Sequence, residues 1–288
     1  MSFVLTLVAE PGALPPPLVA GVREAVCAGA VSVLSRDEAV DLPCPAPPDA
    51  ARLRDAIGAA AVDAVVTREA DRRKRLLIAD MDSTIVTSET LDELATFAGV
   101  GERVAAITRR AMAGEIDFKG ALRERVALLE GLQLDALEKT WAATRFTPGA
   151  RELVATMRAN GATTALVSGG FTFFTGRVAD ALGFATHRSN VLLDDGKALL
   201  GRVQEPILDR DAKLAMLREL AEKHGLAMDE CLAVGDGAND LEMIRAAGLG
   251  VAFHAKPIVA EAAQVRIEHT GLRALLFIQG YRAEEVCQ

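Results

Sequence analysis

Two aspartates, Asp80 and Asp82, lie one residue apart directly after the apolar run Leu76–Ala79. At that spacing, one carboxylate could attack a reacting atom as a nucleophile while the other serves as a general acid. An isolated pair of this kind is more often part of a turn or a helix cap. The pair therefore indicates an enzyme only if other parts of the chain supply the remaining groups of a catalytic site.

Further polar residues follow apolar runs or open a predicted helix later in the chain. They are Ser168 and Gly169 after Thr164–Val167, Lys213 near the start of a predicted helix, and Asp236, Asn239 and Asp240 after Cys231–Val234. In a parallel sheet, ligands bind outside the carboxyl ends of the strands, so these side chains are expected to share one crevice with Asp80. Taken alone, Lys213 would be a solvated helix residue, and Asn239 with Asp240 a helix cap.

The chain resembles the haloacid dehalogenase superfamily from about residue 72 to residue 285. The polar motifs above carry this resemblance, together with the segment Asp80–Thr90. It implies that Asp80 becomes an aspartyl-phosphate, while Asp82 protonates the leaving seryl oxygen and then deprotonates the attacking water. It also implies O-phosphoserine as the small-molecule substrate and a role in the final step of serine biosynthesis.

A metal ion fits this chemistry, because a carboxylate that attacks a phosphate dianion needs cations nearby. Asp80 and Asp236 supply two carboxylates for Mg²⁺, which prefers oxygen ligands, and the resemblance implies the backbone carbonyl of Asp82 as a third ligand. Asp82 must begin the reaction protonated. Nearby carboxylates and partial burial raise the pKa of such a group, whereas a bound metal acts in the opposite direction.

The other polar residues suit a bound phosphate. Lys213 would place a fixed positive charge beside the transferring group, and the Ser168 hydroxyl and backbone N–H groups near Gly169 could hold its oxygens. The resemblance implies that Asn239 and Asp240 position the phosphate, Lys213 or a metal-bound water.

The interval 89–146 contains four helical patterns and no strand, which predicts a helical cap that selects the substrate. Glu89 is placed to meet the ammonium group of an amino acid, or else it merely stabilises a helix N-terminus. Arg125 interrupts an apolar helix stripe, where it could bind a substrate carboxylate or extend to solvent. Met112 and Phe118 match positions that shape the pocket in the family, although such residues are more often core.

Other functions remain open at this point. The related candidates are a phosphotransferase or a phosphatase for another small phosphomonoester. A phospho-accepting signalling receiver module is the candidate from a different class, since it also gathers acidic residues and a lysine around Mg²⁺. Such a module would lack Asp82 and the cap.

The catalytic residues are expected on a doubly wound parallel sheet of the haloacid dehalogenase type, formed by residues 72–288. Its apolar runs, including Leu249–Phe253, lack polar alternation and so suit strands buried on both faces, with helical patterns between them. The pair Asp195–Gly196 predicts a hairpin turn.

The first 71 residues show the order βαββαβ, which predicts a small ferredoxin-like α+β domain. They resemble an ACT-type amino-acid-binding module at Glu10–Leu14, and whether they bind an effector stays open. A sheet face or edge of this domain could pair two copies into a homodimer.

The composition argues against several partners. The 288 residues carry a formal charge of −8 and no long basic run, so nucleic acid is an unexpected partner. Apolar runs fall short of a membrane span and the N-terminus lacks a signal-peptide pattern, so we expect a cytoplasmic protein without a membrane partner. The four cysteines show no paired spacing, which argues against a zinc site or a disulfide framework.

Overall fold

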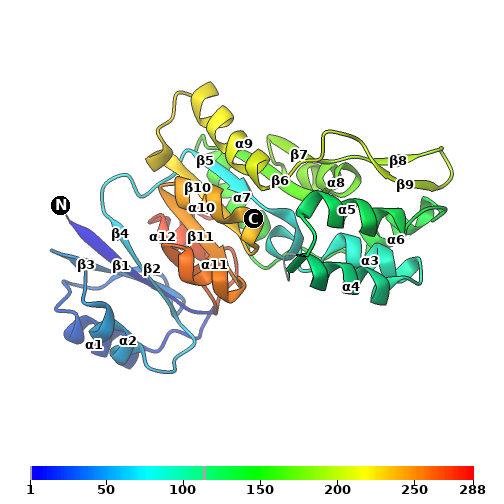
Figure 1. The fold of residues 1–288 in the computed structure, drawn as a ribbon. Helices are drawn as coiled ribbons and strands as arrows, with labels where there is room; N and C mark the ends of the chain where they lie inside the picture. Colours follow the sequence, from blue (N-terminus) through cyan, green and yellow to red (C-terminus); the bar gives the residue numbers. More distant parts are fainter. Residues whose placement is uncertain (1, 113–114) are drawn as a thin grey trace.

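A computed structural model describes residues 2–112 and 115–288, apart from the side chain of Met112. It contains a four-stranded sheet near the N-terminus, a six-stranded central sheet, and a group of helices beyond one end of the central sheet (Figure 1). Within these ranges no helix has the length and apolar character to cross a membrane.

The N-terminal unit has the predicted βαββαβ order. Its strands and helices are β1 (Phe3–Val8), α1 (Pro16–Ala25), β2 (Ser32–Ser35), β3 (Ala39–Cys44), α2 (Ala50–Ile57) and β4 (Asp63–Arg68). All strand pairs are antiparallel, in the order β2-β3-β1-β4. The prediction of a ferredoxin-like α+β arrangement is therefore confirmed.

The central sheet is entirely parallel, in the order β12-β11-β10-β5-β6-β7. Its strands are β5 (Leu76–Ala79), β6 (Thr163–Phe171), β7 (Thr186–Asn190), β10 (Cys231–Gly235), β11 (Leu249–Phe253) and β12 (Val265–Ile267). From β5, the chain first adds strands on one side and later on the other. This reversal places a crevice between the carboxyl ends of β5 and β10, where ligands bind in such folds.

Helices cover both faces of the central sheet. They are α7 (Ala150–Ala159), α8 (Thr172–Leu182), α9 (Arg210–Lys223), α10 (Leu241–Ala246), α11 (Pro257–Ala262) and α12 (Ala274–Ile278). Alternate residues of β5 belong to different hydrophobic clusters: Leu77 lies in the cluster that contains Leu153 of α7, and Ile78 lies in the cluster that contains Leu217 of α9. Burial on both sides explains the unbroken apolar runs and confirms the doubly wound fold.

A helical cap interrupts the chain between β5 and β6. Its helices are α3 (Thr90–Phe97), α4 (Gly101–Met112), α5 (Phe118–Ala127) and α6 (Asp135–Ala143). The two connections to the cap run side by side, because Thr87 N donates to Arg145 O at 3.0 Å and Thr147 N donates to Ile85 O at 3.0 Å. This paired connection holds the cap over the carboxyl ends of the strands (Figure 1).

The hairpin predicted at Asp195–Gly196 forms between β8 (Leu192–Asp194) and β9 (Leu199–Val203). Gly196 has φ +85°, a conformation that few residues other than glycine adopt. The hairpin binds the cap, since Leu199 N donates to Leu132 O at 2.9 Å. The sequence patterns gave no indication of this contact.

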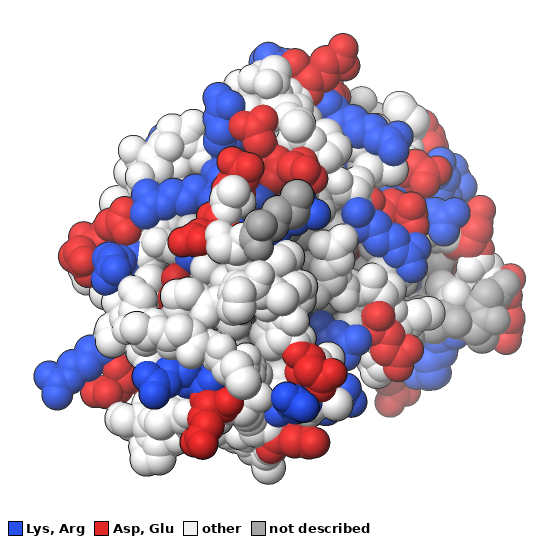
Figure 2. Space-filling view, turned by 90° about the vertical axis from the view of Figure 1, so that its left-hand side faces the viewer, with Lys and Arg blue, Asp and Glu red and all other residues white. Residues whose placement is uncertain are grey.

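The N-terminal sheet is covered on both faces. Helices α1 and α2 pack on one face, whereas Val8 and Val65 of the other face belong to the same hydrophobic cluster as Phe277 of α12. That second face is therefore occupied within one chain and is unavailable for pairing two copies. On the side of the molecule that faces the viewer in Figure 2, acidic and basic side chains are interspersed around an uncharged central area.

Candidate active site

The loop after β5 brings the two predicted catalytic aspartates together. Asp80 is 5% exposed and its Oδ1 accepts from Met81 N at 2.8 Å. The chain then turns tightly, with Ser83 in the left-handed region at φ +54°. Asp82 lies between the start of α3 and β6: its Oδ1 accepts from Thr90 N at 2.9 Å, and its Oδ2 accepts from Ser168 Oγ at 3.2 Å.

Lys213 is the buried cation of the site. Its side chain is 1% exposed, and Nζ lies 2.8 Å from Asp80 Oδ1 and 2.6 Å from Asp240 Oδ1. Burial alone lowers the pKa of Lys213, but the Asp240 and Asp80 carboxylates outweigh it and raise this pKa above the ordinary value. Lys213 is therefore a charged group, and α9 holds it beside the predicted nucleophile.

Gly235 allows Asp240 to approach the strand end. A Cβ at residue 235 would lie 2.4 Å from Asp240 Cγ, so only glycine fits without a shift. The same carboxylate accepts from Gly237 N at 3.0 Å through Oδ2, and so both Asp240 oxygens have partners. This use of both oxygens favours a supporting role for Asp240.

We expect Gly235→Ala to lower the free energy of unfolding by about 1–3 kcal/mol, because the new methyl group must displace the Asp240 carboxylate. Thermal unfolding checks this. Gly21→Ala on α1, where a Cβ would meet nothing within 4 Å, is the control and should leave stability equal or higher. Equal melting temperatures for Gly235→Ala and the wild type would contradict the steric argument.

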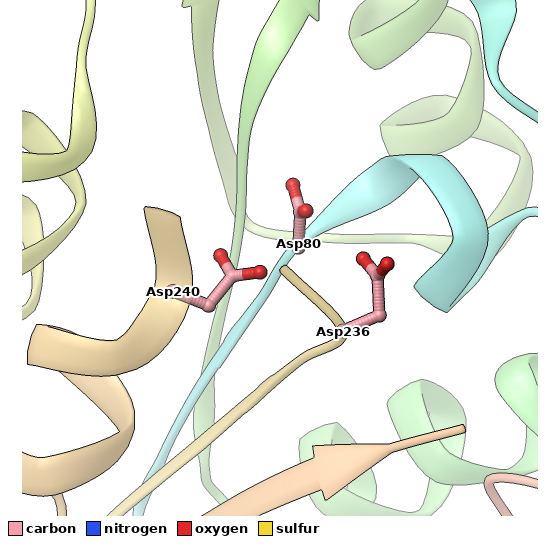
Figure 3. Close-up of side chains that lie close together, drawn as sticks. All are labelled: Asp80, Asp236 and Asp240. Atoms are coloured by element: carbon pink, nitrogen blue, oxygen red, sulfur yellow. The ribbon is translucent and has the colours of Figure 1, made fainter. Parts of the chain in front are cut away.

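Three buried carboxylates converge in the crevice and are suited to a cation. One ligand atom from each of Asp80, Asp236 and Asp240 lies within 4.8 Å of the others (Figure 3). Burial, and then the Asp240 carboxylate, raise the pKa of Asp236 to about 6. Because Lys213 is the single buried lysine beside these groups in the described part of the chain, a hard cation would offset the remaining negative charge.

Ser168 and Gly169 lie inside an extension of β6 and not in a loop after it. Gly170 N donates to Ser168 Oγ at 2.8 Å, and a Cβ at Gly170 would lie 2.8 Å from Asp82 Oδ2. Asn190, at the end of β7, donates from Nδ2 to Gly169 O at 2.8 Å. The sequence analysis missed Asn190, because the polar strand that it ends provided no signal.

The environment of Asp82 favours a protonated acid. Desolvation by the surrounding residues, and then the Glu89 carboxylate, raise the pKa of Asp82 to about 6, although the hydrogen bonds from Thr90 and Ser168 lower it. This carboxyl group can therefore hold and release a proton near neutral pH.

Two of the predicted cap residues, Glu89 and Phe118, contact segments that carry the predicted catalytic residues. Glu89 Oε1 accepts from Ser83 Oγ at 2.8 Å. Burial lowers the pKa of Arg125, and the carboxylates of Asp92 and Glu89 partly offset this change. The Arg125 Nε donates to Ala121 O of the same helix at 3.3 Å. Phe118 reaches the strand end, since its Cζ lies 3.2 Å from where a Gly169 Cβ would be. The side chain of Met112 lies outside the described residues.

Asn239 and Lys256 lie near Asp236. Asn239 is half-buried in the turn after Asp236, and its Oδ1 lies 2.3 Å from the position of a Cβ at Gly237. Lys256 was not singled out from the sequence; its Nζ lies 3.9 Å from Asp236 Oδ2. A lone lysine after a strand carries no recognisable pattern, which explains why the sequence analysis missed it.

The doubly wound sheet and the acidic crevice at its strand ends are matched by a known family of hydrolases. A family model described as haloacid dehalogenase-like hydrolase matches residues 77–245, and the chain belongs to this family. The N-terminal unit lies outside the matched residues.

Known relatives indicate the group within the family. A protein named phosphoserine phosphatase from Archaeoglobus fulgidus is 44% identical over 74% of this chain, which spans 62% of that relative's length. A solved structure of a probable phosphoserine phosphatase from Vibrio cholerae is 33% identical to this chain. The match covers 97% of this chain and 86% of that structure, with a TM-score of 0.81. Another solved structure, described as a phospho-aspartyl intermediate analogue of phosphoserine phosphatase, is 41% identical to this chain. The match covers 71% of this chain and 98% of that structure, with a TM-score of 0.66. The chain thus groups with the phosphoserine phosphatases.

Proposed function

We propose that the chain is a Mg²⁺-dependent phosphatase that hydrolyses O-phosphoserine to serine and phosphate through an aspartyl-phosphate. The observation that carries this proposal is the position of Lys213, which lies between Asp80 and Asp240 in a crevice that also contains Asp82 and Asp236. The names of the similar proteins support the choice of substrate. With this activity, the enzyme would catalyse the final step of serine biosynthesis.

Asp80, Asp236 and the backbone carbonyl of Asp82 would hold the Mg²⁺. Within the described residues, Asp80 Oδ2 accepts no hydrogen bond. Among the same residues, the only cationic side chain within ion-pair distance of Asp236 is that of Lys256. Both carboxylates thus retain oxygens for a metal. When bound, Mg²⁺ would neutralise charge on the transferring phosphate and the attacking carboxylate.

In the first step, an Asp80 oxygen attacks phosphorus and the bond from phosphorus to the seryl oxygen breaks. Asp82 gives its proton to that oxygen, so serine leaves as a neutral alcohol at its side chain. Lys213 keeps Asp80 oriented and places positive charge beside the phosphate. The Ser168 hydroxyl and the neighbouring backbone N–H groups would hold the phosphate oxygens.

In the second step, water attacks the phosphorus of the aspartyl-phosphate. Asp82, now a carboxylate, takes a proton from this water, and the bond between phosphorus and the Asp80 oxygen breaks. Inorganic phosphate and the original Asp80 carboxylate result. Asn239 would position the phosphate, and Asp240 would hold Lys213 in place.

A phosphate-release assay over a panel of phosphomonoesters tests this function. We expect the highest kcat/KM for O-phosphoserine, compared with O-phosphothreonine, a phosphorylated sugar acid and an aryl phosphate. Chelation followed by dialysis should abolish the activity, and added Mg²⁺ should restore it, because two carboxylates of the site need a counter-cation. Full activity of the chelated enzyme, or a clear preference for another ester, would refute the proposal.

Glu89 and Arg125 would bind the ammonium and carboxylate groups of the substrate, and Phe118 would help to shape the pocket. We expect Glu89→Gln and Arg125→Ala each to cost about 2–5 kcal/mol in kcat/KM for O-phosphoserine. The loss for an aryl phosphate should be much smaller, because that substrate has neither group.

The matched control for Arg125 is Arg123→Ala, an exposed position on the same helix that pairs with Glu205 at 2.7 Å. It should behave like the wild type toward both substrates. Equal losses for O-phosphoserine and the aryl phosphate in the Arg125 and Glu89 variants would show that these residues support the cap and do not recognise the substrate.

We further propose that residues 1–71 and 72–288 are two domains, with the cap at about 89–146 inserted in the second. The catalytic groups all come from the second domain. The contacts between the two are polar as well as apolar: Arg72 lies 2.7 Å from Asp41 Oδ2, and both side chains are 10% exposed.

A further inference from the structure

Asp63 is a buried acid of the N-terminal sheet whose partners all belong to the central fold. It is 4% exposed at the start of β4. Its carboxylate accepts from the backbone N–H groups of three consecutive residues and from one hydroxyl. The bonds are Glu268 N at 2.8 Å, His269 N at 3.3 Å, Thr270 N at 3.0 Å and Thr270 Oγ1 at 2.6 Å. A carboxylate that accepts so many bonds fixes the conformation of the segment 268–270.

That segment in turn holds the loop after β11. His254 N donates to Ile267 O at 2.8 Å, and His254 Nε2 bonds to Thr270 O at 2.9 Å. Because a carbonyl oxygen only accepts, the ring proton lies on Nε2. His254 has φ +43°, an uncommon conformation for a residue with a side chain, so these two bonds hold the loop in an unusual turn.

The loop ends on the metal side of the active site. Lys256, two residues after His254, donates from its backbone N to Asp236 O at 3.3 Å, and its Nζ lies 3.9 Å from Asp236 Oδ2. Hydrogen bonds and two peptide units thus connect a carboxylate of the N-terminal sheet to the aspartate that would bind Mg²⁺.

We propose that Asp63 is a positioning residue for this metal site: it holds the segment 268–270, which holds His254, which sets the loop that orients Asp236. The inference rests on the proposed metal site at Asp236. Its consequence is that the N-terminal unit, although it contributes no catalytic group, increases the affinity for Mg²⁺. Partners that orient a metal ligand typically change metal affinity about 10- to 100-fold, and Asp63 acts from a greater distance.

The experiment compares Asp63→Asn and His254→Ala with the wild-type full chain; alanine leaves no donor for Thr270 O. Asparagine replaces one carboxylate oxygen by an NH₂ group. That group cannot accept from the N–H groups of the segment 268–270, which then keep only one acceptor oxygen. We expect each variant to raise the Kd for Mg²⁺, measured by calorimetry without substrate, about 3- to 10-fold. The double variant should have about the same Kd for Mg²⁺ as the single variant that binds Mg²⁺ less tightly, because both changes interrupt the same connection.

A second readout does not depend on metal. Hydrogen exchange of the His254 and Lys256 amides, measured in chelator, should accelerate in Asp63→Asn. Both acceptors, Ile267 O and Asp236 O, remain, but the loop that carries the two amides is then less firmly held and opens more often. The control is Asp41→Asn, since Asp41 is another buried acid of the N-terminal sheet. Its partner Arg72 donates to Ile278 O and, within the described residues, makes no hydrogen bond to the loop after β11. It should leave both the Kd and the exchange of these amides unchanged, even if it lowers the melting temperature.

Unchanged exchange and an unchanged Kd in folded Asp63→Asn would overturn the proposal. So would equal effects from Asp41→Asn, because these would reflect general packing between the two units. A wild-type chain that binds no Mg²⁺ would refute the proposed metal site instead, and the exchange measurement would then still decide whether Asp63 orders the loop. If Asp63→Asn does not fold, His254→Ala decides with the same readouts.

Discussion

Asp80→Asn should reduce kcat for O-phosphoserine by at least about 10³-fold, because the amide cannot attack phosphorus and carries no charge for the metal. The replacement is nearly isosteric and its amide oxygen can still accept from Met81 N, so the fold should persist. Steady-state phosphate release and circular dichroism together check both parts of this expectation.

The matched control is Asp211→Asn, the same substitution at a side chain that is 80% exposed on the helix that carries Lys213. It should retain wild-type turnover. A folded Asp80→Asn enzyme with more than about a tenth of wild-type activity would mean that another group is the nucleophile.

Lys213→Met should have the second large effect, on both activity and stability. Removal of the ammonium group leaves the Asp80 and Asp240 carboxylates buried without their shared partner, which costs about 3–5 kcal/mol in the free energy of unfolding. Loss of a positive charge beside the transferring phosphate should lower kcat about 10²- to 10³-fold. Denaturant unfolding in chelator and phosphate release in Mg²⁺ measure the two effects.

Lys223→Met, at the exposed end of the same helix, controls for the general effect of the substitution. Its unfolding free energy should stay within about 0.5 kcal/mol of the wild type. If Lys213→Met were as stable and as active as this control, Lys213 would neither stabilise the buried carboxylates nor assist phosphate transfer.

The central part of the fold was predictable because each of its strands combines two local signals. Leu76–Ala79 and Cys231–Val234 are uninterrupted apolar runs, and each is followed by residues that cannot stay in a buried strand. Burial on both faces produces the first signal, and the crevice at the strand ends produces the second. The structure accordingly brings Asp80, Asp236 and Lys213 together, as their spacing predicted.

The edge strands and the interior of the site were less predictable. Strand β7 has the sequence Thr-His-Arg-Ser-Asn and carries no apolar pattern, because an edge strand is partly exposed. Asn190 at its end was missed with it. Ser168 and Gly169 were predicted to follow a strand, yet they lie within β6, whose pairing with β7 resumes at Phe171 after an irregularity.

Contacts between distant segments could not be predicted from one sequence at all. Asp63 and Thr270 are separated by 207 positions, and neither residue type has a spacing that points to the other. The same holds for the docking of the β8–β9 hairpin on the cap. Such contacts depend on how complete elements pack, and local patterns contain no information about that packing.

The most direct test of the central claim is to trap the covalent intermediate. The wild-type enzyme is mixed with Mg²⁺ and labelled O-phosphoserine, quenched in acid during turnover, and digested for peptide mapping by mass spectrometry. We predict that one peptide carries the phosphate, that fragmentation places it on Asp80, and that Asp80→Asn gives no labelled peptide. A wild-type enzyme that turns over with no phosphorylated peptide, or one labelled on another residue such as Ser83 or Thr84, would contradict the proposed mechanism.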